Sequence, residues 1–290
     1  MSAKRADKGG GREARRVFEE LRARMVDGTY PVRSFLPSQR ALAEEFGVSR
    51  DTVQRALGEL RRERWIESRQ GSGSRVVKNQ RIQSSTVRAT RERRGLTLGP
   101  LIGEAFERPE VALDVYTLTS ESLDAHIRLQ AERIRSRSIA PERIILRMLL
   151  PLEDPPLPYP RVKDDSDDHR LRERLHGITE RHTDSLRRVL RDLQTEGLVP
   201  QVAVRIRRTP LPPAFKLYLF NGAEALHGFY EIVERPIELE SGEEVTAIDV
   251  LGLGATLTHH VKDGDPQSPG TVFVDSAQAW FDSVWQQLAE

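Results

Sequence analysis

The chain of 290 residues is long enough for two domains, and its 38% hydrophobic and 31% charged residues suit packed cores with much solvated surface. It contains no Cys, which excludes disulfides, thiolate catalysis and Cys-ligated zinc, and no apolar run approaches the roughly 18 residues that cross a bilayer. Residues 1–94 carry 23 Lys and Arg against 12 Asp and Glu, a net +11, whereas the remainder carries 22 against 32, a net −10, so we expect a polyanion partner for the N-terminal part alone.

The N-terminal residues 1–11 are small, basic and rich in Gly, and we predict that they form a disordered tail. They contain no apolar signal core, so we expect a cytoplasmic protein that does not contact a membrane. A first helix is predicted over residues 12–27, because apolar side chains recur there at helical spacing, namely Val17, Phe18, Leu21 and Met25.

Two short helices and a hairpin are predicted to follow. Ser38 suits the N-cap of a helix that ends at Phe46, and after a tight turn at Gly47 the hydroxyl of Ser49 suits the next N-cap. The inward faces of these helices would carry Leu42, Ala43, Phe46, Val53, Ala56, Leu57 and Leu60. Two strands, over residues 65–69 and 74–77, flank a Gly-containing tip. This order of elements indicates a winged helix-turn-helix, an α+β fold.

Residues 12–78 resemble the DNA-binding domain of the GntR family of bacterial transcription regulators. The matching residues are Leu36-Pro37-Ser38-x-Arg40-x-Leu42-Ala43, Gly47-Val48-Ser49-Arg50-x-Thr52-Val53-x-x-Ala56-Leu57-x-x-Leu60 and the wing Gly71-Ser72-Gly73. The resemblance implies DNA contacts from Arg40, Ser49, Arg50, Thr52 and Gly71, with Ser38, Gln54 and Gln70 as further candidates. Arg33 and Arg64 stand where the family often has Gly, and both add positive charge near the expected DNA face.

The positions of two arginines suggest how such a surface would read DNA. Arg50 lies in the first turn of its helix, where a cation opposes the helix dipole by roughly 0.3–1 kcal/mol, so an anion or a base edge is its expected partner. Arg40 and the wing would hold phosphates, while Arg50 could reach a guanine edge with two hydrogen bonds. Because one such helix spans few base pairs, we expect a homodimer on a palindromic operator of double-stranded DNA.

The rest of the chain is predicted to be an Arg-rich linker, residues 79–98, and an α/β effector or dimerisation domain with a mixed sheet, residues 99–290. Strands are expected over residues 111–118, 143–150, 201–208 and 216–220, with more within 228–237 and 245–257. Helices are expected over residues 120–138, 178–196 and 276–288. The five prolines of residues 151–160 predict a loop, and the aspartates of residues 164–168 a solvated one.

One stretch of this domain, Ala214–Gly222, resembles the phospholipase D motif H-x-K-x-x-x-x-D followed by Gly. Lys216 matches the motif lysine, whereas Ala214 and Asn221 replace the His and the Asp. The order of elements also resembles one half of that superfamily. Since the missing His is the nucleophile of those enzymes, the resemblance implies a non-catalytic domain. Lys216 and Asn221 become candidates for binding an anionic small-molecule effector, and no catalytic residue, metal site or cofactor is expected.

These observations lead to a ligand-responsive dimeric repressor as the expected function. Three alternatives stay open from the sequence. The C-terminal domain could be a phosphodiesterase-like enzyme fused to the DNA-binding domain, it could serve only to dimerise the protein, or it could have the chorismate-lyase-like fold of other GntR effector domains. A literal His-x-Lys pair, His260 and Lys262, lacks the later Asp because Gln267 stands in its place, and we interpret it as a surface pair.

Overall fold

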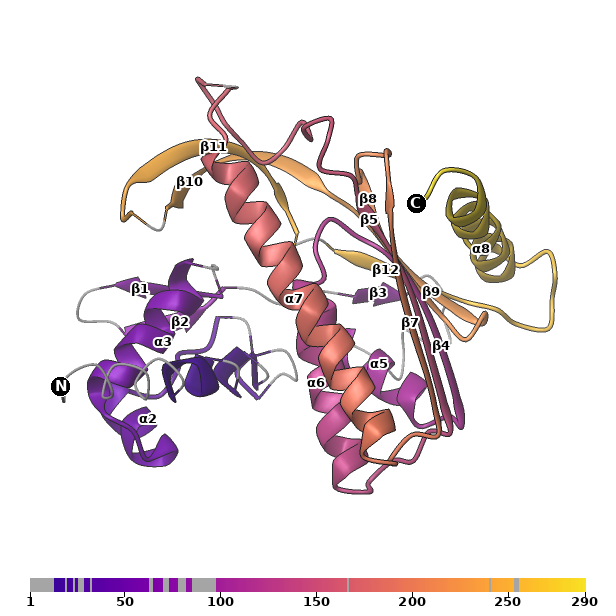
Figure 1. Ribbon diagram of the computed structural model, residues 1–290, viewed down its shortest axis with the longest axis horizontal. Coiled ribbons are helices and arrows are strands. Elements are labelled where there is room, and N and C mark those ends of the chain that lie inside the picture. The colour runs from indigo at the N-terminus through magenta and orange to yellow at the C-terminus, as the bar shows by residue number, and fades with distance from the viewer. Residues whose placement is uncertain are drawn as a thin grey trace. The chain divides into compact units, whose positions relative to one another are not determined.

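The computed structural model of the chain describes residues 13–18, 20–22, 24–25, 29–31, 33–62, 65–69, 73–77, 82–84, 98–165, 167–239, 241–252 and 256–290 (Figure 1). Contacts within the chain divide it into an N-terminal unit, residues 1–79, and a C-terminal unit, residues 80–290. The expected tail over residues 1–11 lies outside the described residues, and so does Arg64.

The N-terminal unit is a helical domain with a small hairpin. Helices α2, Gln39–Phe46, and α3, Arg50–Arg62, precede strands β1, Ile66–Arg69, and β2, Gly73–Val76, which pair antiparallel. Ser38 Oγ accepts a hydrogen bond from the Ala41 amide at 3.2 Å, and Ser49 Oγ accepts one from the Thr52 amide at 3.1 Å. Gly47 takes a left-handed φ of 64°, a conformation that Gly adopts without the steric strain that a Cβ causes. The predicted caps and the predicted turn are therefore confirmed.

The core of this unit is built from the predicted apolar stripes. Residues 13–18, 20–22 and 24–25 are helical, and they bury the expected stripe of Val17, Phe18, Leu21 and Met25. From α3, Val53, Ala56 and Leu60 are fully buried, and Trp65 closes the core before the hairpin. Because one face of α3 is buried in this way, its opposite face is left to solvent.

Arg33 adopts a backbone conformation that explains the glycine of the related family. Its φ is +74°, in the left-handed region that disfavours residues with a Cβ. The surrounding hydrogen bonds hold it there, because the Arg33 amide donates to the Val76 carbonyl at 2.8 Å and Arg75 Nε donates to the Arg33 carbonyl at 3.2 Å. The arginine is thus accommodated by contacts to β2 rather than by its own preference.

The C-terminal unit contains a seven-stranded mixed sheet with the order β3-β12-β9-β8-β4-β5-β7. Its strands are β3 Ile82–Ser84, β4 Glu110–Tyr116, β5 Arg143–Pro151, β7 Gln201–Thr209, β8 Phe215–Phe220, β9 Glu224–Phe229 and β12 Leu257–Val261. Strands β4, β5 and β7 run parallel, while β8 is antiparallel to β4 and β9 is antiparallel to both β8 and β12. The predicted α/β domain with a mixed sheet is confirmed.

Helices cover both faces of this sheet (Figure 1). Helices α5, Leu98–Phe106, α6, Glu121–Arg135, and α7, Arg170–Thr195, bury their apolar side chains against one face. Helix α8, Pro269–Gln287, packs Val274, Phe281 and Trp285 against the other face. The terminal amphipathic helix of the prediction is therefore a core element of the domain.

A second sheet of three antiparallel strands lies beside the N-terminal turns of α7 (Figure 1). It consists of β10, Glu231–Glu238, β11, Glu244–Leu251, and β6, Arg161–Val162, in the order β10-β11-β6. Leu171 of α7 packs with Ile237, Leu239, Val245 and Ala247 of this sheet and its hairpin. Helix α7 thus contacts the main sheet along its length and the second sheet at its start.

Strands β6, β9 and β12 lie wholly or largely outside the expected ranges, and three further elements also differ from the predicted pattern. Within the expected linker, residues 82–84 form β3, which pairs parallel with β12 at the edge of the main sheet. Helix α7 begins at Arg170 rather than residue 178, and α5 was not expected. Polar residues make up most of the first two turns of α7, so the apolar period becomes visible only later in the helix. Pairing with a strand about 175 residues away leaves no local signal in β3.

A buried polar cluster fixes α6 against α7. The Asp124 carboxylate accepts a hydrogen bond from Ser185 Oγ, lies 2.9 Å from His182 Nδ1, and forms an ion pair with Arg128 at 3.2 Å. Asp124 and His182 are both fully buried, and Arg128 Nε also donates to Ser185 Oγ at 3.0 Å. Since a buried carboxylate is tolerated only when it is paired and hydrogen-bonded, this cluster allows one register of the two helices.

We expect Asp124→Ala to lower the free energy of unfolding by about 3–5 kcal/mol, because it leaves buried hydrogen-bonding groups of His182 and Ser185 without their acceptor. The matched control is Asp184→Ala on the same pair of helices. Asp184 forms an exposed ion pair with Arg187 at 3.6 Å, so its removal should cost less than about 1 kcal/mol. Urea unfolding of the full chain measures both, and equal effects would contradict the assigned role.

Candidate functional site

One face of α3 presents polar and positively charged side chains to solvent. Arg50, Gln54 and Arg61 are exposed and lie on the same face at spacings of four and seven residues. This face adjoins the buried face that carries Val53, Ala56 and Leu60. In the part of the chain that the structure describes, Arg50 and Arg61 form no hydrogen bond or ion pair. Their guanidinium groups are therefore available to a partner, and Arg61 extends the face beyond the residues predicted from the sequence.

Arg40 lies on the preceding helix α2 and is also exposed. Its Nε donates to Glu44 Oε1 at 3.1 Å, one turn later in the helix. On α3, Arg55 forms the corresponding pair with Asp51 at 2.9 Å. Arg40 and Arg55 thus share their charge with a neighbouring carboxylate, whereas Arg50 keeps its full positive charge.

The hydroxyl groups predicted to contact DNA are first used to start the helices. Ser38 and Ser49 are exposed but act as caps, and Ser49 Oγ lies 2.9 Å from Thr52 Oγ1. Thr52 itself is only 7% exposed, so its side chain supports the cap and offers little surface to a partner. Gln70 and Gly71, the predicted wing-tip contacts, lie outside the described residues.

The two predicted effector residues of the C-terminal unit are not brought together. They lie at opposite ends of β8, five residues apart, which corresponds to about 17 Å along a strand. Asn221 takes a left-handed φ of 51° and exchanges two hydrogen bonds with the Ala112 backbone, at 2.7 and 2.8 Å. Asn221 is therefore a turn residue that joins the β8–β9 turn to β4.

Lys216 is buried in an aromatic environment. It is 4% exposed, and its Nζ lies 5.6 Å from the centroid of the Tyr230 ring, a cation–π distance. The Tyr230 hydroxyl accepts a hydrogen bond from the Leu118 amide at 2.9 Å and lies 3.1 Å from Thr117 Oγ1. Burial raises the pKa of Tyr230, so this hydroxyl stays protonated. Lys216 thus contacts the ring of Tyr230, whose hydroxyl holds the Leu118 backbone.

The His260–Lys262 pair is not the surface pair expected from the sequence. His260 is half-buried, and its ring stacks on Phe273 with centroids 3.7 Å apart. Burial and the neighbouring His227 lower the pKa of His260 to about 4, so it is uncharged at neutral pH. Lys262 forms an ion pair with Asp275. Among the described residues no group of three or more His, Cys, Asp or Glu side chains could hold a metal ion.

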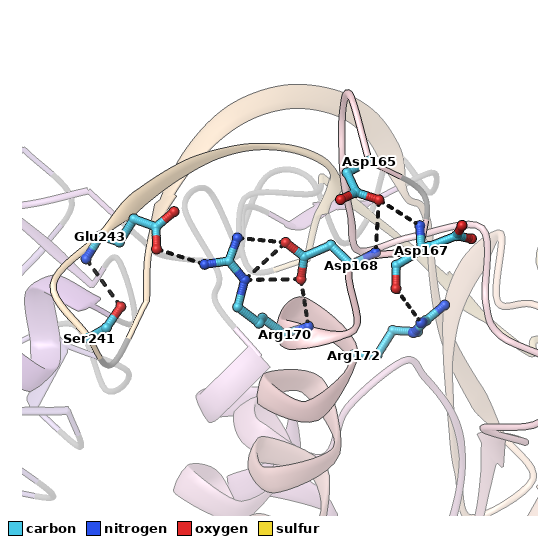
Figure 2. Close-up of polar contacts among 7 residues, drawn as sticks. All are labelled: Asp165, Asp167, Asp168, Arg170, Arg172, Ser241 and Glu243. Carbon is cyan, nitrogen blue, oxygen red and sulfur yellow. Dashed lines mark hydrogen bonds and ion pairs between the residues drawn. The ribbon is translucent and has the colours of Figure 1, made fainter.

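The aspartate-rich loop anchors the start of α7 (Figure 2). Asp168 binds the Arg170 guanidinium at 2.6 Å, and Arg170 Nη1 reaches Glu243 at the β10–β11 hairpin at 2.7 Å. The hydrogen bonds from Arg170 lower the pKa of the Asp168 carboxyl to about 2. Asp165 Oδ1 accepts hydrogen bonds from the amides of Asp167 and Asp168. This loop is structural and connects α7 to the second sheet.

A cavity of about 460 Å³ lies between the proline-rich loop and the first turns of α7. Its lining comes from the end of β4, the loop after β5, α7 and the end of β7: Leu118, Pro151, Glu153, Pro156, Leu157, Tyr159, Pro160, His169, Arg172, Glu173, Leu175, His176, Thr179 and Arg208. Most of this wall is apolar. Neither Lys216 nor Asn221 belongs to it. No local pattern in the sequence indicated this cavity, because its lining residues come from four separate segments.

No helix in the described part of the chain combines the length and the apolar character needed to span a membrane.

The comparisons with known proteins concern mainly the N-terminal unit. The family model described as "Bacterial regulatory proteins, gntR family" matches residues 13–76. The Exu regulon transcriptional regulator of Escherichia coli (strain K12) is 42% identical over 72 residues, which are 23% of this chain and 28% of that protein. The mannosyl-D-glycerate transport/metabolism system repressor MngR of the same organism is 37% identical over 76 residues, 26% of this chain and 31% of that protein.

An uncharacterised HTH-type transcriptional regulator of Rhizobium meliloti (strain 1021) is 34% identical over 82 residues. The chain spans about a third or less of the length of these three relatives, between 28% and 34%. Among solved structures, the N-terminal domain of AraR in complex with mutant ORR3 is 31% identical, with 22% of this chain and 93% of that chain covered and a TM-score of 0.22. A Streptococcus agalactiae GntR structure is 21% identical, with 43% and 45% covered and a TM-score of 0.21.

The match of the family model covers the capped helices α2 and α3 and the β1–β2 hairpin, which are the elements of a winged helix-turn-helix. Residues 13–76 therefore form a winged helix-turn-helix domain that matches the model of the gntR family of bacterial regulatory proteins, and a separate α/β domain with a mixed sheet follows it.

Proposed function

We propose that the protein is a sequence-specific DNA-binding transcription regulator, a ligand-responsive homodimeric repressor that acts on a palindromic operator in the cytoplasm. The observation that carries this proposal is the exposed face of α3, on which Arg50, Gln54 and Arg61 lie beside the buried face. A helix of this width fits the major groove of B-DNA, and its side chains are of the types that read base edges. The relatives of residues 13–76 include a transcriptional regulator and a repressor, which supports the same function.

The exposed residues divide naturally into two roles on DNA. Arg50 can donate two hydrogen bonds to a guanine, and Gln54, one turn later, can do the same for an adenine in the next base pairs. Arg40 and Arg61, at the margins, are suited to phosphates, as are the hydroxyls of Ser38 and Ser49. Gln70 and Gly71 are proposed to bring the wing close to the backbone of the DNA. Thr52 would act by holding the cap rather than by direct contact.

For the C-terminal domain we propose a non-catalytic role with a phospholipase D-like fold. The order strand, helix, strand, proline-rich loop, long helix, strand, motif strand and terminal helix supports it, because β4, α6, β5, α7, β7, β8 and α8 follow that order. Ala214 replaces the nucleophile, so no covalent phosphoryl chemistry is proposed. We propose that this domain senses a small molecule and joins two copies of the chain.

Genomic fragments captured by the full chain should share a two-fold symmetric sequence, with half-sites about 10 base pairs apart or a multiple of that spacing. DNase footprinting and sedimentation of the complex would then give two chains per site. An unselected spread of fragments, or one chain per site, would contradict the proposed dimer on a palindrome. The genes next to the captured fragments would also indicate the class of effector.

We expect Arg50→Ala to weaken operator binding by about 1–3 kcal/mol and to relax the preference at one base position of each half-site, because a bidentate base contact is lost. The control is Arg55→Ala, which removes another exposed arginine of α3, one that is paired with Asp51. This variant should keep the base preference of the parent. Binding to a panel of single-base operator variants measures both, and an unchanged preference in Arg50→Ala would show that α3 is not the reading helix.

Arg40→Ala should weaken binding to all sequences to a similar extent, because a phosphate contact carries no base information. It should also reduce the dependence of log K on log salt concentration by about one unit, as expected when one phosphate contact is removed. Fluorescence anisotropy at salt concentrations from about 50 mM to about 200 mM measures the binding constant and its salt slope. A change in base preference with an unchanged salt slope would assign Arg40 to base reading instead.

A further inference from the structure

We propose that the cavity beneath the proline-rich loop binds a small organic anion whose apolar body is about the size of one or two aromatic rings, with Arg172 as the group that recognises the charge. This site would be where the C-terminal domain senses its ligand, as proposed above. Only the effect of the ligand on DNA binding rests on that proposed function. The binding of the anion itself can be tested without DNA.

The size and the wall of the cavity define the body of the ligand. A volume of about 460 Å³ lies within the range of roughly 300–1,000 Å³ that small-molecule sites occupy. Leu118, Leu157, Leu175 and Tyr159 provide apolar surface, and prolines of the loop complete it. Tyr159 is fixed by its hydroxyl, which donates to the Pro213 carbonyl. A wall of this kind favours a flat or branched apolar group over a sugar or a nucleotide.

The charged groups of the cavity are largely neutralised by one another. Glu153 is held by two partners, because Arg208 Nη1 lies 2.8 Å from Oε1 and His176 Nδ1 lies 2.7 Å from Oε2. Arg208 also donates to the Pro151 carbonyl at 3.2 Å. Glu173 lies 3.4 Å from His169 Nε2. Glu153 is therefore not left to attract a cationic ligand, whereas Glu173 is exposed and lies beside a histidine that carries a charge only when protonated.

Arg172 differs from the other charged groups of the cavity. Its Nη2 donates to the backbone carbonyl of Asp167 at 3.3 Å, and within the described residues no carboxylate forms an ion pair with it. Figure 2 shows the contrast with Arg170, two residues earlier, whose guanidinium is shared by Asp168 and Glu243. A backbone carbonyl satisfies one donor and no charge, so Arg172 retains donors and a full positive charge for a ligand.

The position of Arg172 in α7 adds to this preference for an anion. It lies in the first turn of a 26-residue helix, and His169 at the N-cap and Glu173 in the same turn also line the cavity. The N-terminus of a long helix carries a partial positive charge, which stabilises a nearby anion. The guanidinium and the helix end therefore favour the same charge, while the apolar wall restricts the ligand to a single anionic group on an apolar body.

The test uses two fluorescent probes that share one aromatic body. 1-Anilinonaphthalene-8-sulfonate carries an anionic sulfonate, and N-phenyl-1-naphthylamine lacks it. Titrated into the full chain, the sulfonate probe should bind with one site per chain, and Arg172→Gln should weaken it by roughly tenfold, as expected for loss of a charge-assisted hydrogen bond. The neutral probe should bind the parent and Arg172→Gln equally. Arg187→Gln, which removes an exposed arginine of α7 outside the cavity, should leave both affinities unchanged.

A second pair of variants tests the location independently of charge. Leu157→Trp in the loop and Leu175→Trp on α7 place a larger side chain in the cavity, and each should weaken both probes. Equal binding of the sulfonate probe to the parent and to Arg172→Gln would overturn the role of Arg172. Unchanged binding in both Trp variants, provided that circular dichroism shows them folded, would overturn the cavity as the site.

The outcomes also separate this inference from the proposed function. Arg50→Ala should lose operator affinity and bind the sulfonate probe as the parent does. Arg172→Gln should bind the sulfonate probe roughly tenfold more weakly and still bind the operator. If the chain binds the operator equally well with and without the sulfonate probe, and no probe binds at the cavity, the DNA-binding proposal stands and the anion site is overturned. A chain that binds the probe as described but no DNA sequence selectively would do the reverse.

Discussion

The burial of Asp124 between α6 and α7 is the interaction on which the C-terminal domain depends most. Its carboxylate joins His182, Ser185 and Arg128 in one cluster, and a shift of either helix by one residue would leave these groups without partners in a buried environment. The cluster therefore determines where α7 lies on the sheet. The other contacts of α7, including those of its first turn with the second sheet, follow from this position.

At its other end α7 is held by Arg170, which bridges Asp168 and Glu243. The helix is thus fixed at its middle by a buried carboxylate and at its start by an exposed ion-pair network. Between these two points lie the side chains that line the cavity, Arg172, Leu175, His176 and Thr179. A cavity wall built on a helix fixed at two points is rigid, which favours a preformed site over one that forms on binding.

The N-terminal domain uses its polar side chains in a similar division of roles. Hydroxyls satisfy the helix starts, as Ser38, Ser49 and Thr52 show, and this leaves the cationic side chains of α3 for outside partners. On β8 and the turn after it, polar side chains are likewise used by the fold. Lys216 is buried against Tyr230, and Asn221 is bound to the Ala112 backbone.

The sequence by itself determined the features that depend on local chemistry. Caps, turns and the 3.6-residue apolar period are set within a few residues, so α2, α3 and the hairpin were predicted with small errors at their ends. The start of α7 was placed too late, at residue 178 instead of Arg170. Arg50 and Gln54 were expected from the resemblance to the GntR family, and both are exposed on α3. The mixed sheet followed from the alternation of strands and helices.

Only the tertiary structure decided the features that depend on residues far apart in the chain. Strand β3 has no apolar pattern of its own and exists through its pairing with β12. Asp124 and His182 are separated by 58 residues, and the cavity combines segments from Leu118 to Arg208, so no spacing in the sequence could indicate either. The distance between Lys216 and Asn221 shows the same limit, since a motif gives the order of its residues but an extended strand holds its two ends apart.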